Sequence, residues 1–295
     1  MSDAARARHF TSQRLRLHYA EWGSPDKPPL LLVHGSRDHC RAWDWTAERL
    51  AADWHILAPD ARGHGDSEWA SDGVYTSAAY IYDLAELVRL RCTAPVTIVA
   101  HSAGGSISAG FAALYPERMR KLVLIDGLGI SPESGLTTGH PNLVRRQLPA
   151  DEELRSWIDA RRSFAEKAPR RYPSVDAAAE RLLRENPFLR MEQALHLTTH
   201  GLRRTEDGGF VWKFDNLVRL AHPQDRRDDD FLLMLSKIAC PTLLLWGSAS
   251  YTPDPRHDIR AHAVRNARIE VLEGASHWLH HDGFDWFIAQ LKAFL

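Results

Sequence analysis

Short runs of apolar residues alternate along the chain with segments in which apolar positions recur at helical spacing. Short apolar runs predict strands at 30–33, 55–58, 96–100, 121–125, 241–246 and 269–272, of which 30–33 is fully apolar and 96–100 is expected to be buried. Helical spacing, as at Ile81, Leu84 and Val88, predicts amphipathic helices. These helices are expected at 43–52, 80–90, 104–114 and 284–295. Alternation of apolar and polar residues over 15–22 predicts an antiparallel hairpin at the edge of the sheet.

Apolar strands separated by helices predict an α/β fold, with a mostly parallel central sheet covered by helices on both faces. This rhythm stops in the middle of the chain, where the sequence is polar and helical in pattern. We therefore expect an α/β core made of residues 1–130 and 237–295. Residues 131–236 are expected to form an inserted helical cap that folds over the strand ends.

Composition and charge narrow the class of protein. Lys and Arg number 37 against 38 Asp and Glu, so the formal net charge of −1 gives no reason to expect nucleic-acid or anionic-membrane partners. The apolar runs are too short to cross a bilayer, and the N-terminus lacks an apolar signal core, so a cytoplasmic location is expected. The widely spaced Cys40, Cys92 and Cys240 are expected to be buried, reduced thiols. A small-molecule substrate is the expected partner, and a homodimer is left open.

The stretch VTIVAHSAGGSIS, residues 96–108, carries the first candidate chemistry. A buried strand runs into Ser102 and a helix follows at once, which places the serine at the carboxyl edge of the sheet, where ligands bind. The tight turn requires small residues two positions on either side, and Ala100 and Gly104 satisfy this. The order A-H-S-A-G is thus a variant of the G-x-S-x-G nucleophile motif. Taken alone, the motif is equally compatible with a serine that caps an ordinary helix.

Two other strand ends supply groups that such a serine needs. After the strand at 30–33, Gly35 lets the backbone turn so that the Ser36 N–H, together with that of Ala103, can form an oxyanion hole. Near the C-terminus, EGASHWLHH (273–281) places His277 just after the last strand, where it could act as a general base. His101 is expected to pack beside the serine, and Trp278 could form part of an apolar pocket wall.

Together these motifs resemble the α/β-hydrolase superfamily over residues 10–130 and 237–295, and within it most of all the serine-hydrolase-like proteins and carboxylesterases. The resemblance implies that Ser102 is the nucleophile, His277 the base, and the amides of Ser36 and Ala103 the oxyanion donors. It implies cleavage of a small or medium carboxylic ester, lactone or thioester through an acyl-enzyme. No cofactor and no metal are expected, because nucleotide-binding motifs are absent from the sequence and the three histidines of HWLHH have no acidic or cysteine ligand beside them.

The third member of a catalytic triad departs from the family pattern. The family commonly carries its acid a few residues after the strand that ends here at Trp246-Gly247, and Ser250 stands at that position. Some members carry the acid one strand earlier, which here is Asp126, and neighbouring strand ends lie only about 5 Å apart. Asp126 is therefore the first candidate, and Asp254 and an arrangement without any acid stay open.

Two other functions are compatible with the same motifs. Arg37 and Arg62 are expected at the mouth of the site, where either could hold a substrate carboxylate. Such a contact would favour a carbon–carbon bond hydrolase of the meta-cleavage type. The other alternative is a non-catalytic binding protein that keeps the cleft, for which the missing acid at Ser250 is the only support.

Overall fold

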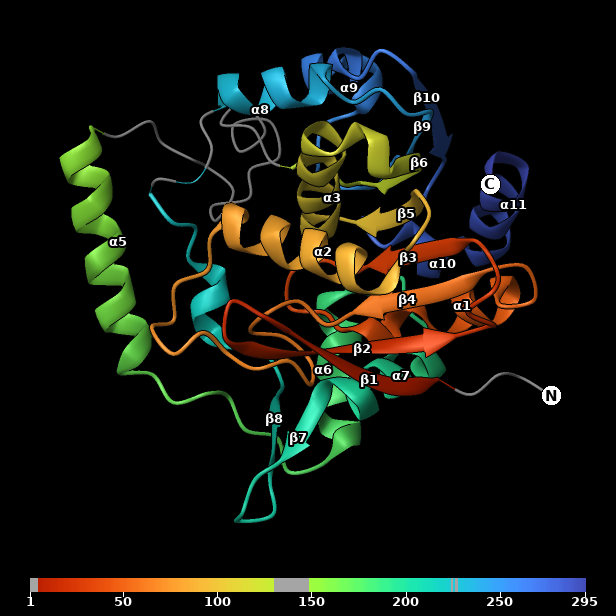
Figure 1. The fold of residues 1–295 in the computed structure, drawn as a ribbon. Coiled ribbons are helices and arrows are strands. Elements are labelled where there is room, and N and C mark those ends of the chain that lie inside the picture. Colours follow the sequence, from red (N-terminus) through yellow and green to blue (C-terminus); the bar gives the residue numbers. More distant parts are fainter. Residues whose placement is uncertain (1–4, 130–148, 224, 226–227) are drawn as a thin grey trace.

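An eight-stranded sheet forms the centre of the computed structural model, which describes residues 5–129, 149–223, 225 and 228–295 (Figure 1). The order of strands across the sheet is β1-β2-β4-β3-β5-β6-β9-β10. The strands are β1 (Arg6–Ser12), β2 (Leu15–Trp22), β3 (Pro29–Val33), β4 (His55–Pro59), β5 (Val96–His101), β6 (Met119–Ile125), β9 (Thr242–Gly247) and β10 (Ala267–Leu272). All the strands that sequence periodicity predicts are present.

Neighbouring strands pair in parallel from β4 to β10. The antiparallel pairs are β1 with β2 and β2 with β4, so the predicted hairpin lies at one edge of the sheet. Because parallel strands are joined by crossover helices, both faces of this sheet are covered, which explains the unbroken apolar runs. The α/β-hydrolase fold with a mostly parallel sheet is confirmed.

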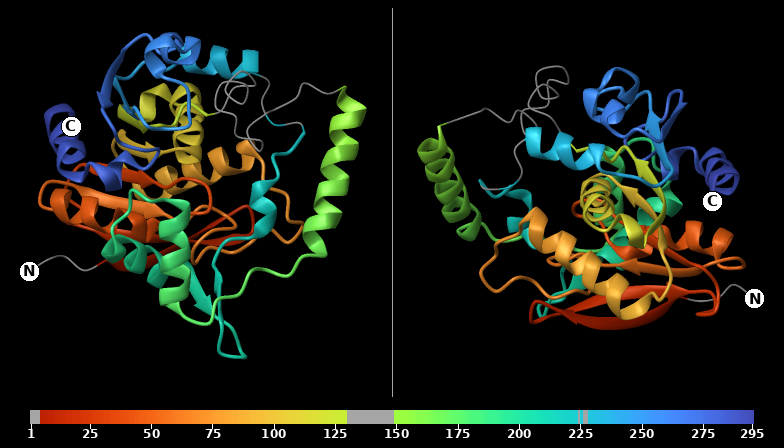
Figure 2. Two further views of the ribbon diagram at one scale, coloured as in Figure 1. Left: turned by 180° about the vertical axis from the view of Figure 1, so that it is seen from behind. Right: turned by 45° about the horizontal axis from the view of Figure 1, so that its top comes forward.

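Helices cover the two faces of the sheet in two layers (Figures 1 and 2). The helices of the core are α1 (Asp44–Leu50), α2 (Ser77–Arg91), α3 (Ala103–Leu114), α8 (Asp228–Ser236), α9 (Ile259–Ala263), α10 (Leu279–Asp282) and α11 (Phe284–Phe294). Short 3₁₀ helices occupy Cys40–Trp43, Pro116–Arg118, Asn216–Arg219 and Pro255–His257.

Alternate residues of each inner strand point to opposite layers. In β3, Leu31 and Val33 join the apolar cluster of α2, α3 and α8, whereas Leu30 and Leu32 join that of α1 and α11. Each fully buried side chain of this kind stabilises the fold by roughly 1.5–3 kcal/mol. The candidate site lies along the carboxyl ends of these strands.

The inserted segment contains more than helices. It comprises α5 (Ala150–Ala165), α6 (Val175–Glu185), α7 (Met191–Gly201) and a short antiparallel pair, β7 (Leu202–Arg204) with β8 (Phe210–Trp212). Helix α7 is joined to the core by a hydrogen bond of 2.9 Å from His39 Nε2 to the Leu197 carbonyl. Helix α5 stands beside the core in both views of Figure 2.

Helix α8 falls within the range 131–236 that the sequence analysis assigned to the cap. Its residues Phe231 and Leu235 are buried in the cluster formed with α2 and α3, so α8 packs as part of the core layer. The limits of the cap as a domain stay a prediction, and residues 130–148 at its start lie outside the described part of the chain. Among the described residues, no helix is both long and apolar enough to span a membrane.

The loop after β4 is held to α2 by a buried ion pair. Arg62 donates to both carboxylate oxygens of Asp83 at 2.6 and 2.7 Å, and the two side chains are 7% and 9% exposed. Ser12 Oγ also donates to Asp83, at 2.6 Å. The expectation that Arg62 lies at the mouth of the site is wrong, because this pairing turns the guanidinium into the protein. The three cysteines are buried and free, as expected.

We predict that Asp83→Ala lowers the free energy of unfolding by about 3–5 kcal/mol, because it leaves the Arg62 charge buried without a counter-ion. Denaturant titration measures the change. The double variant Arg62→Met/Asp83→Leu, which removes both charges, should lose clearly less. A double variant as unstable as the single one would contradict this account.

Candidate active site

Ser102 lies in a sharp turn between β5 and α3. Its backbone has φ 52° and ψ −122°, a conformation that costs a residue with a side chain about 1–3 kcal/mol. The turn brings backbones together so closely that a Cβ on Gly104 would lie 2.4 Å from the His34 carbonyl oxygen. A Cβ on Gly35 would lie 3.1 Å from that of Ser102. Small residues at the turn are therefore required, as the motif predicts.

The structure brings Ser102, His277 and Asp126 into one hydrogen-bonded line. His277 Nε2 lies 2.9 Å from Ser102 Oγ, and His277 Nδ1 lies 2.6 Å from Asp126 Oδ2. Since the carboxylate can only accept, Nδ1 carries the ring proton and Nε2 is left to accept from the serine hydroxyl. The side chains of His277 and Asp126 are 4% and 3% exposed, so water competes little for these bonds.

Asp126 follows the last residue of β6, where its N–H donates to the Leu245 carbonyl of β9 at 2.8 Å. It adopts φ 47°, a left-handed conformation that Asp tolerates better than most residues. Asp254, the other candidate acid, instead forms an ion pair with Arg256 at 2.6 Å. Of the two carboxylates that the sequence left open, Asp126 is the one in contact with the imidazole.

Two backbone amides lie free beside the serine. Within the described residues, neither the Ser36 nor the Ala103 N–H donates to any hydrogen bond. Ala103 is the first residue of α3, and Ser36 follows Gly35, which packs directly against Ser102. Arg37, the next residue, is exposed and has φ 65°. Amides without an acceptor in the protein can donate to an oxyanion, and the oxyanion role of Ser36 and Ala103 stays a prediction.

Aromatic rings surround the imidazole of His277. His101 Nε2 donates to the His277 carbonyl at 2.9 Å, and the two rings lie 4.7 Å apart. Because His101 is 2% exposed, burial holds the pKa of its imidazole well below the usual value and leaves it neutral. His101 therefore supports the backbone of His277; its contact with substrate stays a prediction. The ring of Trp278 meets that of His277 edge-on at 5.0 Å and is partly buried, and its place in a pocket wall stays a prediction.

The contacts of three residues in the loop after β9 were not predicted from the sequence. The ring of Tyr251 lies 4.5 Å from that of His277, and burial raises the pKa of the Tyr251 phenol. Ser250 Oγ and Thr252 Oγ1 both donate to the Asp126 carboxylate. The signal was present in the stretch SASYT after Trp246-Gly247, where the sequence analysis noted only that a carboxylate is missing.

In the part of the chain that the structure describes, two groups of side chains away from Ser102 have a composition that suits a metal ion: His18 with Cys40 and Asp60, and Asp44 with His196 and His200. In the first, Asp60 already accepts from His18 Nδ1 at 2.7 Å. In the second, Arg41 donates to both oxygens of Asp44. Both carboxylates are thus engaged by protein donors.

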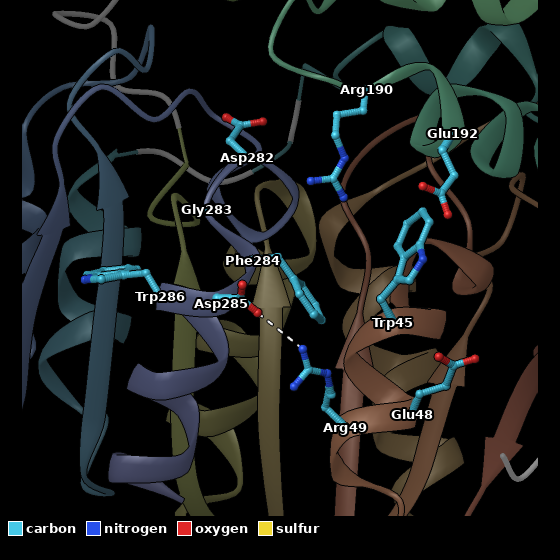
Figure 3. Close-up of a pocket in the computed structure, with 10 residues that line it drawn as sticks. All are labelled: Trp45, Glu48, Arg49, Arg190, Glu192, Asp282, Gly283, Phe284, Asp285 and Trp286. Atoms are coloured by element: carbon cyan, nitrogen blue, oxygen red, sulfur yellow. Dashed lines mark hydrogen bonds and ion pairs between the residues drawn. The ribbon is translucent and has the colours of Figure 1, made fainter. Parts of the chain in front are cut away.

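A hollow of about 500 Å³ lies away from Ser102, between α1, the start of α7 and α11. Figure 3 shows Trp45 and Phe284 on its walls, with Arg190 facing it from the inserted segment. Asp282, at its upper side, accepts at 2.8 Å from the N–H of Ser276, the residue before His277. This wall therefore helps to hold the loop that carries the imidazole.

The chain matches the sequence model of the α/β hydrolase family over residues 30–290. It belongs to that family, and it is a hydrolase of the α/β-hydrolase type. A serine hydrolase-like protein of Danio rerio is 28% identical over 255 residues, which cover 81% of this chain and 74% of the relative. Epoxide hydrolase 4 of Mus musculus is 26% identical over 294 residues, covering 95% and 76%.

Solved structures share the fold. The thioesterase domain from the curacin biosynthetic pathway superposes with a TM-score of 0.83 at 23% identity, covering 99% of this chain and all of that domain. At this identity the likeness concerns the fold alone. The expected α/β-hydrolase resemblance is thus confirmed from the family, the relatives and the fold.

We predict that stability falls when the pH is lowered from 7.5 to 5. Burial lowers the pKa of His281 to about 4, whereas in the unfolded chain it is about 6.5. Between those values the unfolded chain binds a proton that the folded chain does not, so unfolding is favoured by about 2 kcal/mol at pH 5.

Denaturant titrations at both pH values measure this loss. In His281→Gln the difference between the two pH values should shrink by that amount. The exposed His262, changed to Gln, serves as the matched control and should leave the difference unchanged. Equal pH dependence in His281→Gln and the unchanged protein would contradict the assignment.

Proposed function

We propose that this protein is a serine hydrolase that cleaves a small or medium carboxylic ester, or a lactone or thioester, through an acyl-enzyme on Ser102. The observation that carries the proposal is the unbroken line from Ser102 Oγ through both nitrogens of His277 to Asp126. Such a line is the arrangement by which a buried carboxylate and an imidazole activate a hydroxyl.

The geometry supports each step of acyl transfer. Ser102 Oγ attacks the substrate carbonyl while its proton passes to His277 Nε2, and Asp126 stabilises the imidazolium that forms. The carbonyl oxygen, now negative, accepts from the amides of Ser36 and Ala103. His277 then protonates the departing alcohol or thiol. Water, deprotonated by the same ring, attacks the acyl carbon, the bond to Ser102 Oγ breaks, and the imidazolium returns the proton to that oxygen.

The serine at position 102 distinguishes the proposed ester hydrolysis from epoxide hydrolysis, the activity named for some relatives. Epoxide opening on this fold would form an alkyl ester with a carboxylate side chain, and position 102 holds a serine. A hydroxyl activated by an imidazole suits attack on a carbonyl carbon instead. An ester-type bond is therefore favoured over an epoxide.

The alternatives left open by the sequence receive less support. For carbon–carbon hydrolysis, Arg62 is unavailable because it pairs with buried Asp83, which leaves the exposed Arg37 of the two arginines that the sequence suggested. The case for a non-catalytic binding protein rested on Ser250, and Asp126 supplies the carboxylate that it lacks. A small-molecule substrate as partner is part of the proposal; a cytoplasmic location and a homodimer stay predictions.

We predict that a fluorophosphonate probe labels the protein at one residue and that Ser102→Ala abolishes both labelling and turnover. The reason is that the probe needs a hydroxyl activated by a base. Mass spectrometry identifies the labelled residue, and p-nitrophenyl esters, lactones and thioesters of graded size measure turnover. Labelling that persists in Ser102→Ala would remove this assignment.

We predict that Asp126→Asn lowers kcat by on the order of 10³–10⁴, because an amide favours the wrong ring tautomer of His277. Asp254→Asn is the matched control, since its carboxylate pairs with Arg256 and it should change kcat little. Steady-state kinetics on the best ester decides between them. A larger loss of kcat in Asp254→Asn than in Asp126→Asn would assign the acid to Asp254.

A further inference from the structure

The loop after β9 supplies hydroxyl groups where the sequence pattern of the family leads one to expect an acid. Ser250 Oγ donates to Asp126 Oδ2, the same oxygen that accepts from His277 Nδ1. Thr252 Oγ1 donates to the other oxygen, Oδ1. Both carboxylate oxygens are thus held from the β9 side, although the carboxylate itself belongs to β6.

The neighbouring donors determine which acceptor each of the two hydroxyl protons points to. The Thr252 N–H donates to Ser250 Oγ at 3.1 Å, and Trp246 Nε1–H donates to Thr252 Oγ1 at 3.0 Å. These N–H groups cannot accept, so each hydroxyl keeps its own proton for another partner. The two hydroxyl oxygens lie 3.3 Å from each other, farther than either lies from the carboxylate. The carboxylate is therefore the better acceptor of both protons.

We propose that Ser250 and Thr252 are positioning residues that hold the Asp126 carboxylate in the orientation His277 requires. The inference rests on the proposed function of Ser102, His277 and Asp126. A carboxylate at the end of a strand has two torsions free to rotate, and three donors converging on its oxygens fix both. Because Asp126 accepts from His277 Nδ1, a fixed carboxylate also fixes the orientation of the imidazole ring and the position of Nε2.

The same contacts imply that the carboxylate can be moved to the neighbouring loop. Ser250 Oγ and His277 Nδ1 share one acceptor atom, so the side chain at position 250 ends beside the nitrogen that needs a carboxylate. Strands β6 and β9 are paired up to Ile125 and Leu245, which fixes the spacing of the two positions. Asparagine at 126 tolerates the positive φ there and offers an amide N–H to a carboxylate at 250.

The first test removes the two hydroxyls in Ser250→Ala/Thr252→Val. We expect kcat to fall about 10- to 100-fold with KM little changed, as when supporting partners of an active-site ligand are lost. The acidic limb of the pH profile of kcat/KM should also shift, because the carboxylate charge is then shared with the imidazole alone. Ser250→Thr and Thr252→Ser keep the hydroxyls and should recover part of the loss; Asp254→Asn, in the same loop, should shift nothing.

The second test is the exchange Asp126→Asn/Ser250→Asp. We expect it to regain at least about 10-fold of the kcat lost in Asp126→Asn, one tenfold step being about 1.4 kcal/mol of barrier. It should also restore fluorophosphonate labelling of Ser102. Thermal unfolding of every variant accompanies the kinetics, and if the double hydroxyl variant does not fold, the exchange and the two conservative variants decide the question.

The outcomes separate the two proposals. If Ser102→Ala leaves turnover intact, the proposed function fails. If Ser102 and Asp126 are required, yet the hydroxyl variants keep kcat and the acidic limb and the exchange regains nothing, then Ser250 and Thr252 only shape the loop and the positioning role is overturned.

Discussion

The geometry of the candidate site depends on the backbone of Ser102, which is held in a conformation that residues with side chains rarely adopt. The surrounding structure supports it from both sides: its N–H donates to the Ile125 carbonyl at 3.0 Å, and Gly104 lets α3 approach the His34 carbonyl. Since β5 lies between β3 and β6, this turn stands between the strand that leads to Ser36 and the strand that leads to Asp126. All other contacts of the site are arranged around that point.

The sequence was sufficient to propose Ser102, His277 and Asp126 as candidates because each comes shortly after a predicted strand. Parallel strands bring their carboxyl ends to one edge of the sheet. Residues that follow different strands in the sequence are therefore expected to lie close together. The contacts of Ser250, Tyr251 and Thr252 could not be predicted in this way, because they depend on how one loop folds. The pairing of Arg62 with Asp83 escaped for a similar reason: it joins a loop to a helix 21 residues away. Strands β7 and β8 have three residues each, too few to show a period.

The contact between Asp126 and His277 shows that a carboxylate can reach the imidazole from more than one strand of a parallel sheet. The imidazole needs an acceptor at one point in space, and two neighbouring strands end within reach of it. In this chain β6 supplies the charge and the loop after β9 supplies hydrogen-bond donors. The difference from the usual family pattern is therefore that the carboxylate follows a different strand of the sheet.

Ser102 and His277 are 175 positions apart in the chain, yet their side chains touch. Contacts between residues so distant in sequence form late, since the intervening segments must be ordered before the ends can meet. A growing polypeptide that has β5 and α3 but has not yet emerged as far as β9 and β10 carries the serine without its base. If Ser102 reacts as proposed, it gains its base only when the segment after β10 has reached the sheet, so labelling of Ser102 by the probe would report completed folding.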